Sequence, residues 1–135
     1  MKKFLIVLLV AMGIAATADA QVVKYRATDM AYKYETSNGN WSNWSDWQSS
    51  SVLVVINFTN ETVQIYSQET QEFDIVGQVS DWKSDNKGGQ MMEVSCVDKD
   101  GKRCNMRFRQ QSDGQLQLYV DYRDFMYVYN IEKRQ

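Results

Sequence analysis

The segment 91–108 constrains the fold more than any other part of the chain, because its pattern specifies a β-hairpin together with its register. Lys99-Asp100-Gly101 is typical of a three-residue hairpin loop, in which the glycine takes the left-handed conformation after a type I turn. This loop places Cys96 directly opposite Cys104. In that register one face is apolar and the other is polar, so turn chemistry and hydrophobic alternation predict the same pairing.

Cys96 and Cys104 are the only cysteines in the sequence. Directly opposed strand positions can reach the Cα separation that a disulfide needs, so we predict a bond between them. The loop that it closes is short, and we expect it to contribute about 2–3 kcal/mol at most. A redox or metal-binding pair is the alternative, which the absence of histidine and of a C-x-x-C motif disfavours.

Residues 1–20 have the features of a secretory signal peptide. Two lysines precede an apolar run, and Ala18-Asp19-Ala20 forms a small-x-small cleavage site before Gln21. The apolar run is too short for a comfortable membrane span. We therefore expect a periplasmic or extracellular protein with one domain at 21–135, which is not an integral membrane protein once the signal is removed.

The charge balance of this expected domain excludes one class of partner. Removing residues 1–20 from the 135-residue chain leaves 115 residues with 13 basic and 16 acidic side chains, a net charge of −3. Proteins that bind nucleic acid usually carry a basic patch or run, and the sequence has none. We therefore expect no nucleic-acid partner.

Short alternating or β-branched runs separated by turn residues recur throughout the rest of the chain, and no window shows a helical repeat. Such a meander, with one continuous apolar face, predicts an eight-stranded antiparallel up-and-down barrel, and a two-sheet β-sandwich is the alternative. The first strand should contain a bulge near Thr28-Asp29. Besides the strands of the central hairpin, we expect strands at about 23–34, 52–59, 62–67, 73–79, 116–122 and 125–132, and a turn-rich loop at 81–89.

Turn residues also set the register of two further hairpins. A turn at Asn60-Glu61 places Phe58 opposite Val63, and Ser112-Asp113-Gly114 places Phe108 opposite Leu118. The inward positions are bulky, so we expect a largely filled interior and no large open cavity. The predicted inward residues are Ile56, Phe58, Ile65, Phe73, Ile75, Met92, Met106, Phe108, Leu118, Tyr127 and Tyr129, and Val79 is assigned to the same side as Phe73 and Ile75.

Trp41, Trp44 and Trp47 recur at a spacing of three in a polar loop. This spacing resembles the tryptophan ladder of thrombospondin type 1 repeats, in which arginines stack between the indoles, and Arg107 and Arg109 are candidates for such stacking. We treat these five residues as a candidate site for a small apolar or aromatic ligand, an envelope protein or a carbohydrate.

The alternative for this loop is a structural one. In that case the loop closes one end of the barrel and buries the three indoles. A second patch is predicted to face outward, either covered by this loop or forming an interface. It consists of Val55, Tyr66, Tyr119, Met126 and Val128.

Gly39-Asn40-Trp41 matches the G-x-W signature of lipocalins. The broader pattern combines a signal peptide, W-x-x-W-x-x-W, IYS, CVDKDGKRC and LQLYVDY. It resembles families of small exported proteins of Gram-negative bacteria, some of which have lipocalin-like or calycin-like barrels. The resemblance implies a barrel and brings no activity with it.

The sequence contains no histidine, which removes the usual general base and the Ser-His and Cys-His nucleophile arrangements. Acidic residues fall mostly on turns and outward positions, and they do not complete a twelve-residue calcium loop. We therefore expect a non-catalytic protein without a cofactor or a bound metal.

Overall fold

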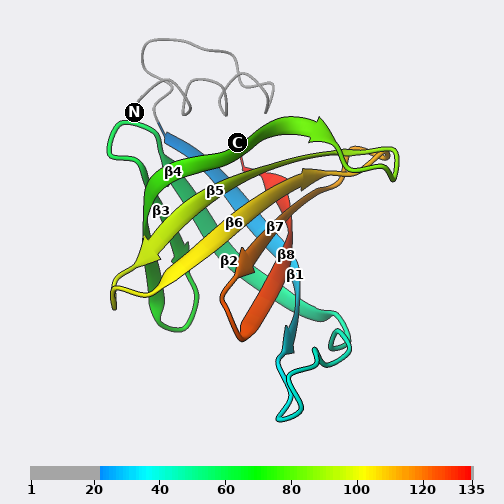
Figure 1. Cartoon of the computed structure of the whole chain (residues 1–135). Coiled ribbons are helices and arrows are strands. Elements are labelled where there is room, and N and C mark those ends of the chain that lie inside the picture. The colour runs from blue at the N-terminus through cyan, green and yellow to red at the C-terminus, as the bar shows by residue number, and fades with distance from the viewer. Residues whose placement is uncertain (1–21, 135) are drawn as a thin grey trace.

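The structure, a computed structural model, describes residues 22–134 and consists of one closed antiparallel barrel (Figure 1). The eight strands follow one another around the barrel in sequence order, and the last pairs with the first. This confirms the predicted eight-stranded barrel, an architecture consistent with a calycin-like fold, in place of the sandwich. The strands are β1 (Val22–Tyr34), β2 (Gln48–Asn57), β3 (Thr62–Tyr66), β4 (Thr70–Ser84), β5 (Gln90–Asp98), β6 (Arg103–Gln110), β7 (Leu116–Asp121) and β8 (Phe125–Lys133).

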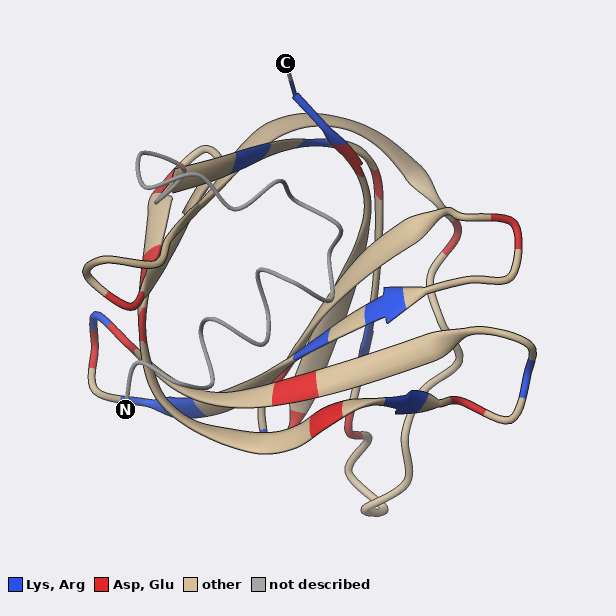
Figure 2. Ribbon diagram, turned by 90° about the horizontal axis from the view of Figure 1, so that it is seen from above, with Lys and Arg blue, Asp and Glu red and all other residues tan. Residues whose placement is uncertain are grey.

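The predicted signal peptide lies outside the described residues. Within residues 22–134, no helix is long and apolar enough to cross a membrane. Seen from above, both basic and acidic positions are scattered over the strands and the turns (Figure 2).

The central hairpin, β5–β6, has the predicted register. Cys96 pairs with Cys104, and Gly101 is left-handed with φ of 83°. The Asp98 carboxylate stabilises the turn because its Oδ1 accepts hydrogen bonds of 2.9 Å from the backbone N–H groups of Asp100 and Lys102. Both cysteines are free thiols in the structure, so the disulfide stays a prediction.

The predicted register of β2–β3 is wrong by two residues. Ile56, not Phe58, pairs with Val63. The turn is longer than predicted because the Asn57 side chain accepts hydrogen bonds from the backbone N–H groups at 59 and 60, at 3.0 and 3.1 Å. Glu61 then closes the turn in the left-handed region, with φ of 57°. A register shift of two residues keeps the same side chains facing inward, so the core residues of these strands were still predicted correctly.

Strand β4 is much longer than predicted and takes up the first part of the expected loop at 81–89. Its pairing with β5 is irregular in three places, one of them between Gln78 and Ser80. Each extra residue of a bulge changes which side chains face inward, and Val79 is 53% exposed, against the prediction. The bulge predicted in β1 is confirmed by a register shift between Ala27 and Asp29.

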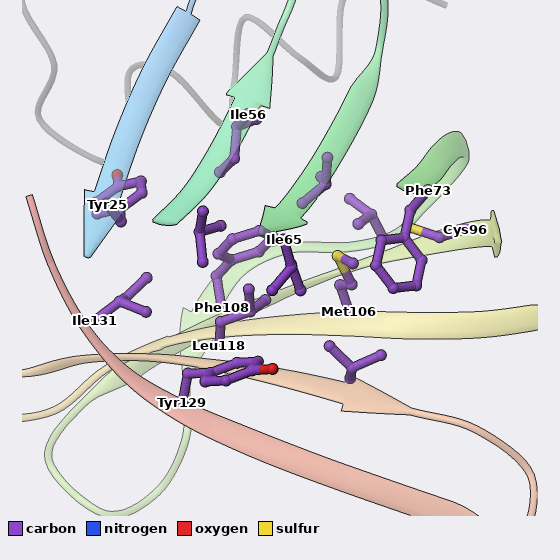
Figure 3. Packing of buried hydrophobic residues seen from close by; sticks show 14 of the residues in the cluster. Tyr25, Ile56, Ile65, Phe73, Cys96, Met106, Phe108, Leu118, Tyr129 and Ile131 are labelled. Carbon is purple, nitrogen blue, oxygen red and sulfur yellow. The ribbon is translucent and has the colours of Figure 1, made fainter. Parts of the chain in front are cut away.

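Large side chains from all eight strands fill the interior of the barrel. Figure 3 shows Ile65, Phe108 and Leu118 pointing toward one another from three different strands. Every residue predicted to point inward is buried except Val79. Burying a side chain of this size contributes about 1.5–3 kcal/mol relative to an exposed position. Because the interior is packed, the surfaces that are open to a binding partner are the outer wall and the rims.

Candidate functional site

The tryptophan loop, residues 35–47, lies alongside the end of β1 and is held there by two of its serines. The backbone N–H of Ser42 donates to the carbonyl of Tyr34 over 2.7 Å, and that of Ser45 donates to the carbonyl of Tyr32 over 2.8 Å. The two serine hydroxyls accept hydrogen bonds of 3.0 Å from the backbone N–H groups of the same tyrosines. The spacing that repeats the tryptophans therefore also repeats the serines that fasten the loop.

Lys33 supplies a cation between the first two indoles. Its Nζ lies 5.6 Å from the centre of the Trp41 ring and 4.9 Å from that of Trp44. Strand alternation turns Lys33 outward, since Tyr32 packs against the interior. The resemblance to a tryptophan ladder predicts arginines in this role, and Lys33 was missed. Its available signal was its position on the strand that precedes the loop.

Arg107 reaches the same surface through Tyr119. Its Cζ lies 4.1 Å from the centre of the Tyr119 ring, and the rings of Tyr119 and Trp44 meet in a T-shaped arrangement with centroids 6.1 Å apart. The guanidinium is also held by Asp121 in two hydrogen bonds, of 2.5 and 3.0 Å. Lys33, Trp44, Tyr119 and Arg107 thus form one row across the outer wall, with Trp41 at its end; we call it the aromatic–cation row.

Arg109 does not belong to this row. Its Nε donates to Asp85 Oδ2 over 2.9 Å, which connects the β4–β5 turn to the end of β6. The β4–β5 and β6–β7 turns project together from the barrel at this point (Figure 1). The hydrogen bond from Arg109, with those from the backbone N–H groups of Lys87 and Gly89, lowers the pKa of Asp85 to about 2. Of the two predicted arginines, the structure brings only Arg107 to the tryptophans, and Arg109 fixes a turn.

The three indoles remain accessible. Trp41, Trp44 and Trp47 are 38%, 39% and 49% exposed, so the alternative in which the loop buries them at the barrel end is wrong. The predicted outward patch is less uniform: Tyr66 is 42% exposed, whereas Val128 is covered and only 2% exposed. The exposed aromatic surface therefore belongs mainly to the loop.

A second feature lies at the rim of the barrel, between the β5–β6 and β7–β8 turns. It is a hollow of about 590 Å³, which was not predicted from the sequence. In a meander these two turns lie at the same end, which was the available signal. The hollow is lined by Asp98, Asp100, Lys102, Arg103, Tyr122, Arg123, Asp124 and Phe125.

One wall of this hollow is a hydrogen-bonded pair. The Tyr122 hydroxyl donates to Asp98 Oδ2 over 2.7 Å. Burial and this bond raise the pKa of Tyr122. Burial alone would raise the pKa of Asp98, but hydrogen bonds from Tyr122 and from the backbone N–H groups of Lys102 and Asp100 lower it overall. Asp98 is therefore ionised, and hydrogen-bond donors of the protein itself stabilise its charge.

The cysteine pair lies just inside the same rim. The hydrogen bond between the thiols raises the pKa of Cys96, as does burial, and it lowers the pKa of Cys104. Tyr122 also lowers the pKa of Cys104. Cys104 is therefore the thiol of the pair that ionises first, and the thiolate is the form that reacts in disulfide exchange.

Comparisons with models of known protein families, with curated proteins and with solved structures found no significant match.

Proposed function

We propose that this chain is an exported, non-catalytic binding domain that engages a protein partner through the surface of Trp41, Trp44 and Trp47. One observation carries the proposal: three neighbouring indoles are 38–49% exposed on a loop that the protein holds in place. Tryptophan is enriched among the residues that dominate protein–protein binding energy, because it buries a large area with few rotatable bonds.

The aromatic–cation row supports this surface by ordering it before a partner arrives. Lys33 contacts two indoles, and Trp44 is backed by the Tyr119 ring, which is itself held over Arg107. Side chains that are already ordered lose less conformational entropy on binding, which increases affinity. The loop therefore presents a preorganised aromatic patch with a cation inside it.

The position of the patch favours a macromolecule over a small ligand held inside the barrel. The interior is filled by packed side chains, and the indoles lie along the outer wall beside β1. A small ligand needs a concave site that covers most of its surface, whereas a protein partner can cover an open wall. The absence of histidine from the sequence and the pairing of Arg107 with Asp121 support binding without catalysis.

Export belongs to the same proposal. It rests on the signal-like residues 1–20 and on the direct opposition of Cys96 and Cys104, which suits disulfide formation in an oxidising compartment. We also propose that the chain is related to the small exported bacterial barrels that its sequence resembles.

The test compares partner binding by two variants of the protein exported from its native host. Trp44→Ala with Trp47→Ala removes two indoles, and Tyr66→Ala removes an aromatic side chain that is 42% exposed on β3, away from the loop. We expect the double variant to lose about tenfold or more in affinity for a partner that the Tyr66 variant still binds. Retention of every partner by the double variant contradicts the proposal, and indole-dependent binding to a glycan array replaces the protein partner with a carbohydrate.

A further inference from the structure

The rim hollow between the β5–β6 and β7–β8 turns is separate from the indole surface, since no tryptophan lines it. Its volume of about 590 Å³ lies within the range of small-molecule sites, about 300–1,000 Å³. Two kinds of side chain meet there: charged groups from the turns and the aromatic rings of Tyr122 and Phe125. The charges and the rings together define which ligand the hollow suits.

One ammonium and two guanidiniums line the hollow. Within the described part of the chain, the side chains of Lys102, Arg103 and Arg123 make no ion pair and no hydrogen bond, in contrast to Arg107 and Arg109. A guanidinium presents its N–H groups in a planar fork that matches the oxygens of a carboxylate or a related oxyanion. An anionic group therefore finds donors at this rim without breaking an existing pair.

The acidic side chains of the lining limit the charge of that ligand. Asp98 accepts hydrogen bonds on both oxygens, from Tyr122 and from two backbone N–H groups, and the charge of Lys102 also stabilises its ionised form. With Asp100 and Asp124, the lining has three carboxylates beside its three cations, so its formal charge is zero. The guanidiniums of Arg103 and Arg123 can together receive one anionic group, whereas a nucleotide would bring several negative charges to a rim whose formal charge is already zero.

The aromatic part of the hollow is fixed from behind. The Phe125 ring lies 6.2 Å from Tyr32 in a stacked arrangement and 5.8 Å from Tyr127, centroid to centroid. A ring that is packed on one side and half-exposed on the other offers a rigid surface for a second flat ring. We propose that the hollow binds a small aromatic monoanion, with its ring against Phe125 and its carboxylate or sulfonate between Arg103 and Arg123.

Two fluorescent probes test this inference because they share an aromatic body and differ in charge. 1-Anilinonaphthalene-8-sulfonate carries a sulfonate, and N-phenyl-1-naphthylamine is its neutral counterpart. We expect the natively folded protein to bind the anionic probe at one saturable site, about tenfold or more tighter than the neutral probe. Near-ultraviolet circular dichroism of each sample confirms that the binding is to folded protein.

The decisive variant is Arg103→Gln with Arg123→Gln. It should weaken binding of the anionic probe about tenfold or more and leave the neutral probe unchanged. The matched control, Arg26→Gln with Arg134→Gln, removes two guanidiniums that line a different hollow and should change neither affinity. Phe125→Leu should weaken both probes.

Three results overturn the inference: equal affinity for the two probes, full anionic-probe binding by the Arg103 and Arg123 variant, or loss of that binding in the Trp44→Ala with Trp47→Ala variant. The last result places the probe on the indole surface. Because the partner-binding proposal depends on that surface alone, either idea can fail while the other holds.

Discussion

The Lys33 ammonium lies 4.9 Å from the centre of the Trp44 ring and 5.6 Å from that of Trp41. One outward lysine of β1 thereby joins the tryptophan loop to the barrel wall, where Trp44 meets Tyr119. The relationship explains how exposed indoles stay ordered: their rings are held by a cation and by a neighbouring ring, while more than a third of each indole remains open to a partner.

Replacing Lys33 with methionine tests this link, since the variant keeps the apolar stem and removes the charge. We expect a loss of about 0.5–1 kcal/mol in the free energy of unfolding, the usual size of an exposed cation–π contact. Urea unfolding followed by circular dichroism measures it. Lys24→Met is the control, because Lys24 is exposed on the same strand without a ring contact in the structure, and an equal loss in both variants refutes the link.

The contributions of Arg107 and Asp121 to the free energy of unfolding should be coupled. The side chains are 26% and 18% exposed and make two hydrogen bonds, so a double-mutant cycle with Arg107→Met and Asp121→Asn should give about 1 kcal/mol of coupling. The Arg26–Glu132 pair, at 3.7 Å with both side chains 59% exposed, should give about 0.3 kcal/mol or less. Similar values for the two cycles argue against a structural role for Arg107.

The contact between Arg109 and Asp85 predicts an acid-sensitive turn. The pKa of Asp85 is lowered to about 2, below its usual value of about 3.9. The contribution of Asp85 to stability is therefore fully present above about pH 4 and is lost as the pH falls through the folded-state pKa. The difference in unfolding free energy between the native protein and Asp85→Asn should shrink over this range.

A nuclear magnetic resonance titration of the Asp85 carboxyl checks the same point directly. Arg109→Gln should raise the pKa of Asp85 toward its usual value, because it removes the largest cause of the shift. An unchanged pKa in that variant assigns the shift to the backbone N–H groups of the turn instead.

The exported protein should contain a Cys96–Cys104 disulfide. The two thiols lose two protons and two electrons to an oxidised thiol–disulfide partner, with the Cys104 thiolate as the attacking group. Intact mass should be lower by two hydrogens than that of the reduced chain, and denaturing alkylation without reductant should label neither cysteine. Reduction should cost about 2 kcal/mol of stability. Full alkylation of both thiols in freshly exported protein contradicts the prediction.

The sequence predicted those parts of the fold that local chemistry determines. Gly101 and the turn before it set the register of Cys96 with Cys104, because a hairpin loop of known type leaves no freedom in the pairing. The β2–β3 turn was mispredicted because Asn57 bonds to the backbone beyond the strand and Glu61 adopts a conformation that glycine usually takes. Val79 was misplaced because a bulge leaves no clear mark in the alternation.

The candidate site was predictable only in part. The indoles were visible as a repeat, and their exposure follows from the serines that fix the loop beside β1. That Arg107 and not Arg109 reaches the indoles depends on which strands lie near the loop in the closed barrel, and pairing within hairpins does not reveal this. The rim hollow depends in the same way on two turns, at Gly101 and Arg123, that are neighbours only in space.

Photocrosslinking in the native envelope tests the central claim that the indole surface binds a protein. A benzophenone side chain replaces Trp47, which is 49% exposed, or, in the control, Tyr66, which is 42% exposed. We expect one discrete protein adduct from position 47 and no such adduct from position 66. Excess unlabelled native protein should prevent formation of the adduct, and excess Trp44→Ala with Trp47→Ala variant should not. Absence of an adduct at 47, or the same adduct from both positions, would contradict this claim.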